Sequence, residues 1–131
     1  MVSGIKSDVE HIEDAMSAAN MAWWEIEFPS GALKFSKNKT DMLGYDAKDF
    51  YHYTKFTDLL HPDDYDAAMQ AMKDHMSGKA EVYETHYRIK ASNGEYRTFY
   101  DKGRVVERND VGFIIAGIVV DVTGNDRFPA K

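Results

Sequence analysis

The residue types best suited to metal chemistry lie together at His61, Asp63 and Asp64. Imidazole and carboxylate groups are common ligands of zinc and of hard cations. However, Pro62 is favoured at the first position of a helix, where its missing N–H costs nothing. Acidic residues also favour the positive end of the helix dipole. We therefore interpret this run as a helix start and assign no metal site.

No arrangement typical of a catalytic site is present. The glycines never form the Gly-x-Gly of a phosphate-binding loop, and neither a Gly-x-Ser-x-Gly elbow nor a His-Glu-x-x-His motif occurs. The sequence has no cysteine, which excludes thiolate metal sites, cysteine nucleophiles and thiol adducts to a cofactor. We therefore expect that this segment is not an enzyme and has no catalytic residue.

Large apolar side chains form the remaining candidate site. Met69, Met72 and Met76 fall on one face of the helix predicted after the His-Pro-Asp-Asp run. Tyr83 and Tyr87 share one face of the following strand. Methionine fills cores and also lines binding cavities. These residues mark where a pocket would lie, and a cavity of about 300 Å³ or more there would favour ligand binding.

Three strands are predicted to follow that helix, at Tyr83 to Ile89, Tyr96 to Val106 and Phe113 to Val122. Asn93-Gly94 is typical of a tight hairpin turn in which both residues have positive φ. The last strand is almost entirely apolar, as expected of a central strand in a sheet.

The residue pattern in the first half of the chain predicts a hairpin followed by irregular structure. Residues from Trp24 to Phe28 alternate between apolar and acidic, which indicates a half-buried strand. A second short strand is expected at Leu33 to Phe35. We expect a short helix within Lys39 to Tyr45 and a loop from Tyr51 to Phe56.

An apolar stripe precedes the first strand. Its members follow a 4-3-4-3-4 spacing, which places them on one helix face: Ile5, Val9, Ile12, Met16, Ala19 and Trp23. This spacing is also that of a coiled-coil seam, although the stripe is shorter than three or four heptads. The helix therefore packs either on its own domain or on a partner chain. In the second case the dimerisation residues are Ile5, Val9, Ile12 and Met16.

Composition limits the classes of partner. The 131 residues suffice for one compact domain with a core. The net charge is −6 and the lysines and arginines are scattered, so we expect no nucleic-acid binding. No apolar run has membrane-spanning length and no secretory signal is visible, so we expect no membrane contact and place the protein in the cytoplasm.

Taken in order, the motifs resemble those of a PAS domain of the His-Pro-Asp-Asp and Asp-Val-Thr subgroup. The resemblance runs from Trp23 to Thr123. It rests on Trp24-Glu25 leading to Gly31, Met42-Leu43-Gly44-Tyr45, His61-Pro62-Asp63-Asp64, Tyr87-Arg88, Asn93-Gly94, Tyr96-Arg97, Gly103-Arg104-Val105-Val106, Gly117 and Asp121-Val122-Thr123.

The resemblance implies an α+β fold, with a five-stranded antiparallel sheet and short helices on one face. The expected division is an amphipathic leader helix at residues 1–21, a PAS domain at 22–123 and a C-terminal tail at 124–131. In the family a ligand lies between the long helix and the sheet. The corresponding pocket residues here would be Met69, Met72, Met76, Tyr83, Tyr87, Ile115, Gly117 and Val119.

The resemblance also implies a role in signal transduction. A small molecule or cofactor would be sensed, and its state relayed to a covalently linked effector such as a histidine kinase, a cyclic-dinucleotide enzyme or a transcription regulator. Asp121 and Thr123 would couple the sheet to that effector. The alternative is a ligand-free interaction module that acts through dimerisation, and we expect a homodimer.

Departures from the family pattern limit which cofactors are possible. Light-sensing flavin members use a cysteine, which is absent, so that adduct chemistry is excluded. No residue fills the role of a haem ligand, and the cofactor stays unassigned. Ile26 stands where the family often has a tryptophan. The smaller side chain either leaves room for a ligand or is compensated by repacking of its neighbours. Gly124 and Pro129 oppose a continuing output helix after Thr123.

Overall fold

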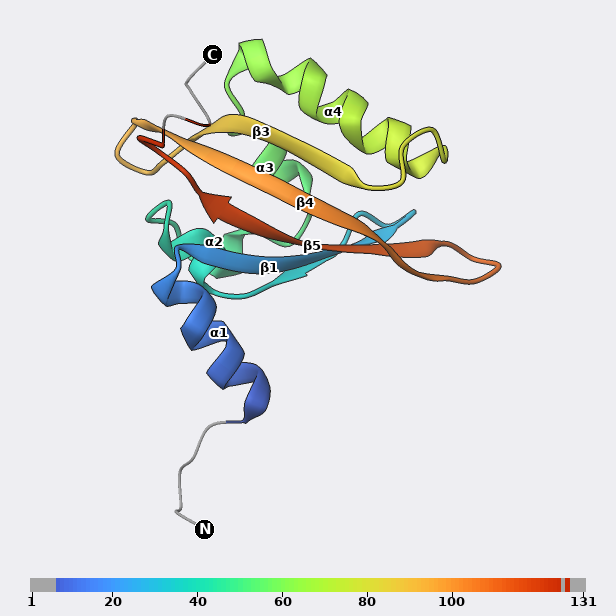
Figure 1. Cartoon of the computed structure of the whole chain (residues 1–131), viewed down its shortest axis with the longest axis horizontal. Helices are drawn as coiled ribbons and strands as arrows, with labels where there is room; N and C mark the ends of the chain where they lie inside the picture. The colour runs from blue at the N-terminus through green and yellow to red at the C-terminus, as the bar shows by residue number, and fades with distance from the viewer. Residues whose placement is uncertain (1–6, 126, 128–131) are drawn as a thin grey trace.

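The chain folds into a five-stranded antiparallel sheet with strand order β2-β1-β5-β4-β3 (Figure 1). The computed structural model describes residues 7–125 and residue 127. The strands are β1 (Met21–Phe28), β2 (Leu33–Phe35), β3 (Tyr83–Lys90), β4 (Tyr96–Arg108) and β5 (Phe113–Asp121). The helical elements are α1 (Asp8–Ala18), α2 (Asn38–Asp41), the 3₁₀ turn η1 (Ala47–Asp49), α3 (Thr54–Thr57) and α4 (Pro62–Met76). This is the α+β architecture expected from the sequence.

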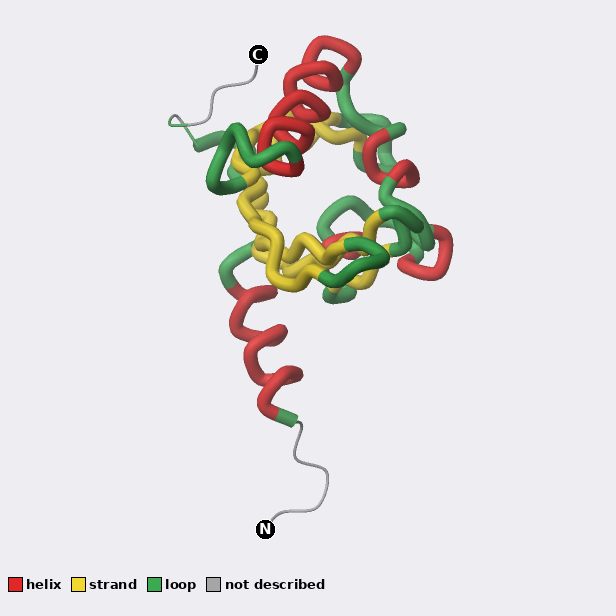
Figure 2. The backbone as a smooth tube through the Cα atoms, turned by 90° about the vertical axis from the view of Figure 1, so that its right-hand side faces the viewer, coloured by secondary structure: helices red, strands yellow, loops and turns green. Residues whose placement is uncertain are grey.

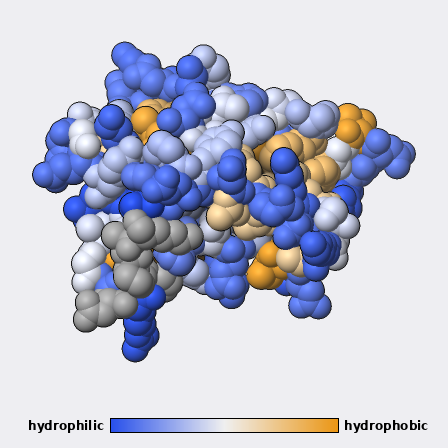
Figure 3. All heavy atoms as spheres, turned by 90° about the horizontal axis from the view of Figure 1, so that it is seen from above, coloured by the Kyte–Doolittle hydropathy of each residue, from blue (hydrophilic) through white to orange (hydrophobic). Residues whose placement is uncertain are grey.

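The core lies between one face of the sheet and the helices that cover it. In Figure 2 the strands curve into a wall, and α4 with the short helices closes the opposite side. Phe99, Ile115 and Val119 contribute fully buried side chains from the two central strands. Seen from the side of α4, the surface is mostly hydrophilic, with hydrophobic residues only in separate patches (Figure 3). No helix of the described part is long and apolar enough to span a membrane.

The His-Pro-Asp-Asp run is the start of α4, as predicted. His61 Nδ1 accepts a hydrogen bond from the Asp63 N–H at 3.1 Å, which caps the helix. Asp64 is almost fully buried and accepts three hydrogen bonds from Arg88 of β3, from its backbone N–H, its Nε and its Nη2. The first acidic residue therefore faces solvent, whereas the second attaches the helix start to the edge strand.

His75 attaches the other end of α4 to the sheet. The buried imidazole accepts a hydrogen bond at Nε2 from the Val105 N–H at 2.9 Å. Because that nitrogen accepts, Nδ1 carries the proton and donates to the Ala80 carbonyl oxygen at 3.0 Å. Both ring nitrogens are thus occupied within the fold. Val105 also begins an irregularity in the pairing of β4 with β5, where the register shifts before Glu107.

The turn between β3 and β4 differs from the prediction. Gly94 has a φ of 89°, but Asn93 does not have a positive φ. Its side-chain oxygen instead accepts the Glu95 N–H at 3.0 Å, and a backbone hydrogen bond joins the Ala91 N–H to the Glu95 carbonyl at 2.8 Å. The prediction of two positive-φ residues was wrong because the asparagine stabilises a longer loop through its side chain.

Two further predictions need correction. The helix expected within Lys39 to Tyr45 ends at Asp41, although Gly44 does adopt a positive φ of 80°. The segment expected as a loop from Tyr51 to Phe56 enters α3, which begins at Thr54. Phe56 is buried within this short helix. The burial depends on packing against distant residues, which no local sequence pattern indicates.

The leader helix α1 is shorter than the apolar stripe. It begins at the Ser7 capping box and ends at Ala18, so Trp23 lies in β1 and not on the helix. Asn20 reverses the chain with a φ of 58°. The Trp23 Nε1–H donates to Glu13 Oε2 at 2.7 Å, which holds α1 beside the first strand. Figures 1 and 2 show α1 projecting away from the body of the domain.

Candidate functional site

A cavity of about 90 Å³ lies between α4 and the inner face of the sheet. Its walls come from β1, β2, β3, β4, α2, α3 and α4, and they are mostly apolar. The lining residues include Ile26, Leu33, Tyr53, Leu60, Ala68, Met69, Met72 and Ile89. The volume falls short of the value of about 300 Å³ expected to favour ligand binding, which is also the lower end of the range of about 300–1,000 Å³ typical of pockets for drug-sized ligands. It exceeds the roughly 10–15 Å³ that one water molecule requires, so the core is not completely filled.

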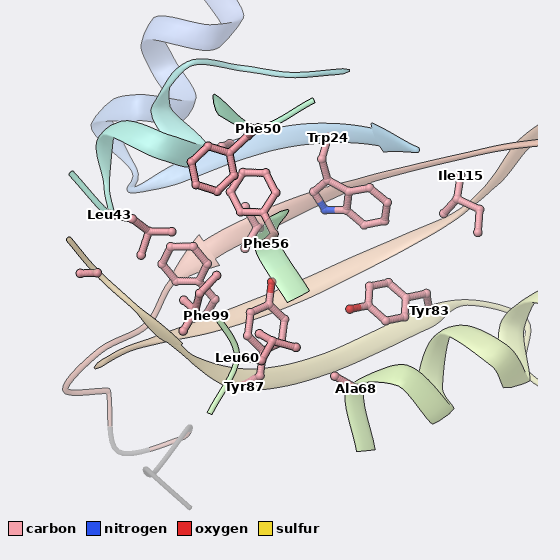
Figure 4. Close-up of a cluster of buried hydrophobic side chains, with 14 residues drawn as sticks. Trp24, Leu43, Phe50, Phe56, Leu60, Ala68, Tyr83, Tyr87, Phe99 and Ile115 are labelled. Atoms are coloured by element: carbon pink, nitrogen blue, oxygen red, sulfur yellow. The ribbon is translucent and has the colours of Figure 1, made fainter. Parts of the chain in front are cut away.

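A buried carboxylate organises the polar part of the cavity wall. Asp101 of β4 accepts a hydrogen bond from Trp24 Nε1–H at 2.6 Å on one oxygen. Its other oxygen accepts from the Tyr87 hydroxyl at 2.9 Å. The Tyr83 ring contacts the Trp24 indole edge to face, with centroids 5.8 Å apart. Figure 4 shows Trp24, Tyr83 and Tyr87 pointing into the same space from β1 and β3.

A buried lysine lies in the same wall. Lys39, from the short helix α2, has only 5% of its side chain surface exposed. Its Nζ lies 3.9 Å from the centroid of the Phe56 ring, a distance suited to a cation–π contact. Lys39 and Asp101 both line the cavity and are the charged residues among its described lining.

Burial and the opposite charges of Lys39 and Asp101 determine how the pKa values of the titratable groups in the site are shifted. Burial lowers the pKa of Lys39, and the negative charge of Asp101 opposes that shift. Burial raises the pKa of Asp101, opposed by the charge of Lys39 and by the hydrogen bonds from Tyr87 and Trp24. Burial and the nearby carboxylate both raise the pKa of Tyr83 and of Tyr87. Both tyrosines are therefore neutral phenols at neutral pH.

The structure brings together half of the ligand-binding residues expected from the sequence. Met69, Met72, Tyr83 and Tyr87 line the cavity. The other four do not belong to the lining: Met76, Ile115, Gly117 and Val119. Ile115 and Val119 are instead fully buried in the core, and Met76 packs against it.

Gly117 has a packing role that its position in the motif did not indicate. It pairs with Trp24 across β1 and β5 and with Gly103 across β4 and β5. A Cβ at Gly117 would lie 2.4 Å from Trp24 Cζ2 and 2.4 Å from the Lys102 carbonyl oxygen. The absence of a side chain lets the indole lie against the sheet, where it reaches Asp101.

Sequence reasoning did not assign Trp24, Lys39 or Asp101 to the site. One signal was available for Asp101, because it shares the period-two phase of Phe99 in the same strand and therefore points inward. No comparable signal marks Lys39, which lies in a four-residue helix made entirely of polar residues. Lysine is almost never fully buried without a partner, so its burial is informative.

The predicted relay residues connect the ends of several strands. Asp121 forms an ion pair with Arg97, with Oδ2 at 2.8 Å from Nη2, and its N–H donates to the Asn20 carbonyl at 2.9 Å. The Thr123 hydroxyl donates to Asp121 Oδ1 at 2.6 Å and accepts from the Thr98 N–H at 2.9 Å. The end of β5, the start of β4 and the link from α1 to β1 therefore meet at these side chains.

The predicted dimerisation stripe is largely exposed. Val9 and Ile12 each expose 60% of their side-chain surface, and Met16 is half-buried. No described residue of α1 is buried. Ile5 lies outside the described residues, as does Pro129 in the expected tail.

A family model described as "PAS fold" matches residues 32–119, which extend from β2 into β5 and include every cavity-lining element except β1. The solved structure of a sensory box histidine kinase/response regulator from Burkholderia thailandensis is similar, with a TM-score of 0.71 and 24% identity. The alignment covers 89% of this chain and 88% of that one. At this identity the likeness describes the fold.

Two relatives are similar in sequence. A methyl sulfide methyltransferase-associated sensor from Methanosarcina acetivorans is 30% identical over 103 residues, covering 76% of this chain and 10% of that protein. A blue-light-activated histidine kinase from Brucella ovis is 26% identical over 122 residues, covering 93% of this chain and 24% of that protein. The chain thus spans at most about a quarter of the length of these relatives.

Proposed function

Because this chain belongs to the PAS-fold family, we propose that it is a signal-transduction sensor domain that binds a small molecule between α4 and the sheet. The observation that carries the proposal is the cavity of about 90 Å³, whose apolar wall contains the buried side chains of Lys39 and Asp101. Binding sites combine an apolar lining with few convergent polar groups, and this wall has that composition. The small volume restricts the ligand to a compact molecule.

The relay is proposed to run along the strands that form the cavity wall. Asp101 lies two residues after Phe99 in β4, and Phe99 pairs with Asp121 across β4 and β5. A ligand that changed the hydrogen bonds of Asp101 would therefore act on β4, which is paired with the end of β5 at Asp121. The Asp121–Asn20 hydrogen bond would carry the same change to α1.

We propose that the output is a covalently linked effector. The sensor and the histidine kinase among the relatives are much longer than the matched segment, which supports this arrangement. A histidine kinase is our first proposal, and a cyclic-dinucleotide enzyme or a transcription regulator are the others. No catalytic step is assigned to this segment. The absence of cysteine excludes a flavin–thiol adduct here.

A cavity-filling substitution tests ligand binding. Ala68 is buried on α4 and lines the cavity, so Ala68→Leu places extra carbon atoms in that space. We expect freshly purified wild-type protein to retain a small molecule in native mass spectrometry, and the Ala68→Leu variant to lose that added mass while remaining folded.

Ala67→Leu is the matched control, because Ala67 is exposed on the same helix. It is expected to keep the added mass. A bound mass that survives Ala68→Leu unchanged would place the ligand elsewhere, and a wild-type protein without any retained mass would count against the proposal.

The exposed stripe of α1 favours a second function, that of a homodimerisation module. Val9 and Ile12 expose large apolar side chains next to each other on one helix face. We propose a second copy of the chain as the partner, because the stripe has the spacing of a two-stranded seam. The two functions are compatible, because Asn20, which follows α1, accepts a hydrogen bond from the Asp121 N–H at the end of β5.

Introducing charge into this stripe tests the dimer. We expect size-exclusion chromatography with light scattering to give a dimer for the wild-type chain and a monomer for Val9→Lys/Ile12→Lys, because burying two ammonium groups in an apolar seam is unfavourable. His11→Lys, at an exposed position off the stripe, is expected to remain dimeric. A monomeric wild-type chain would contradict the proposal.

A further inference from the structure

Lys39 offers hydrogen-bond donors that the described part of the protein does not use. The residue is only 5% exposed and lines the cavity, and no hydrogen bond or ion pair joins Nζ to any described residue; because the described part has no fully buried side-chain nitrogen without a partner, Nζ itself keeps contact with accessible space. Its nearest characterised contact is the face of the Phe56 ring. A buried ammonium normally requires acceptors, because transfer from water without them is costly. The donors of Lys39 are therefore available to a molecule in the cavity.

Asp101 accepts no hydrogen bond from Lys39 in the described structure. One of its oxygens is bonded to Trp24 and the other to Tyr87. These two donors hold the carboxylate in place against β1 and β3. The attraction between Asp101 and Lys39 is consequently exerted through space, without a direct contact. Lys39 and Asp101 nevertheless balance each other in charge, so the cavity wall is neutral overall.

We propose that Lys39 is the recognition residue for the ligand, and that the ligand is a compact, neutral, mainly apolar molecule with one acceptor oxygen. This inference rests on the proposed function, since it names the ligand class of the same cavity. A carbonyl or ether oxygen would accept from Nζ, and the remaining atoms would contact Met69, Met72 and the Tyr83 ring. An anion would instead add a second negative charge close to Asp101 in a medium of low polarity.

Cavity size sets an upper bound on this ligand. An apolar cavity of about 150 Å³ is known to hold benzene, and the present one is smaller at about 90 Å³. The ligand is therefore expected to be smaller than benzene in volume, or to bind with a small outward movement of the half-buried Met72 side chain. Methionine suits this movement because it is unbranched and flexible.

A set of three matched probes tests the proposal on the complete chain. The ketone acetone, the alkene 2-methylpropene and the anion acetate are all smaller than benzene. The alkene has a methylene group in place of the ketone oxygen, and the anion has an oxygen in place of one methyl group of the ketone. Binding is followed through the ¹³C-methyl signals of Met69 and Met72, with Met16 on α1 as an internal reference. We expect the ketone to bind at least about tenfold more tightly than the alkene, because only it accepts a charge-assisted hydrogen bond.

Two variants assign the preference to Lys39. Lys39→Met keeps approximately the length of the side chain but removes the donors. In this variant the ketone and the alkene are expected to bind with about equal affinity. Lys34→Met, at an exposed position of β2, is expected to leave the preference unchanged. The comparison of the three probes on the wild-type protein remains decisive if the Lys39 variant fails to fold.

The outcomes separate this inference from the proposed function. Equal affinities for the ketone and the alkene would overturn the role of Lys39 while leaving a ligand-binding cavity in place. Tighter binding of acetate than of the ketone would overturn the assignment of a neutral ligand. If none of the three probes shifts the Met69 and Met72 signals, both this inference and small-molecule binding in the cavity are contradicted.

Discussion

Replacement of Asp101 with alanine is expected to lower the free energy of unfolding by about 2–5 kcal/mol, because each buried donor left without its acceptor costs roughly 1–3 kcal/mol and the charge opposite Lys39 is lost as well. The substitution leaves Lys39 in the cavity wall without its compensating charge. It also removes the acceptor of the Trp24 indole N–H and of the Tyr87 hydroxyl. Urea denaturation followed by tryptophan fluorescence and by circular dichroism measures the change.

Two comparisons make this prediction specific. Asp58→Ala removes an exposed carboxylate and is expected to change stability by no more than about 0.5 kcal/mol. The double variant Asp101→Leu/Lys39→Met removes both charges, so it should be more stable than Asp101→Ala by at least about 1 kcal/mol. A loss below about 1 kcal/mol for Asp101→Ala would show that the carboxylate does not hold this wall together.

Substitution of Gly117 by alanine is expected to destabilise the domain by about 1–3 kcal/mol, the range typical of overpacking. The new Cβ would meet the Lys102 carbonyl oxygen and the Trp24 ring, each at 2.4 Å. The oxygen belongs to the backbone of β4 and cannot move without disturbing the pairing of β4 with β5. The indole would therefore be displaced and its hydrogen bond to Asp101 lengthened, which denaturation curves and the tryptophan emission spectrum would report together.

Ala116→Val is the matched control for this substitution. Ala116 neighbours Gly117 in β5 but points to the opposite, more open face of the sheet. Adding two methyl groups there is expected to change stability by no more than about 0.5 kcal/mol. Should Gly117→Ala be as stable as Ala116→Val, the close approach of Trp24 to β5 would not be a constraint on the fold.

Both predictions concern one structural unit, formed by Trp24, Gly117 and Asp101. Gly117 lets the indole lie against the sheet, and the indole donates to the carboxylate. A change in the cavity would reach Asp121 through the two central strands, because Phe99 and Asp121 are paired there. We therefore expect variants of this unit to alter both ligand binding and the geometry at the end of β5.

Much of the fold followed from local patterns. The alternation of Tyr83, Tyr87 and Ile89 placed one face of β3 inward, and the structure confirms it. Pro62 and the adjacent acids located the start of α4 because they satisfy the requirements of a helix N-terminus. The errors lay in irregular segments, such as the loop at Asn93 and the helix α3, where side-chain hydrogen bonds and distant packing decide the backbone.

Periodicity within single segments of the chain predicted the order of the elements, the inward faces of α4 and β3, and four of the cavity residues. The polar groups of the site, in contrast, depend on contacts between distant segments. Trp24, Lys39 and Asp101 come from three separate segments, and their spacing along the chain carries no periodic signal. Their burial, their hydrogen bonds and the donors left on Lys39 exist only once the sheet and helices have closed around them, because long-range packing and not local propensity removes these groups from water.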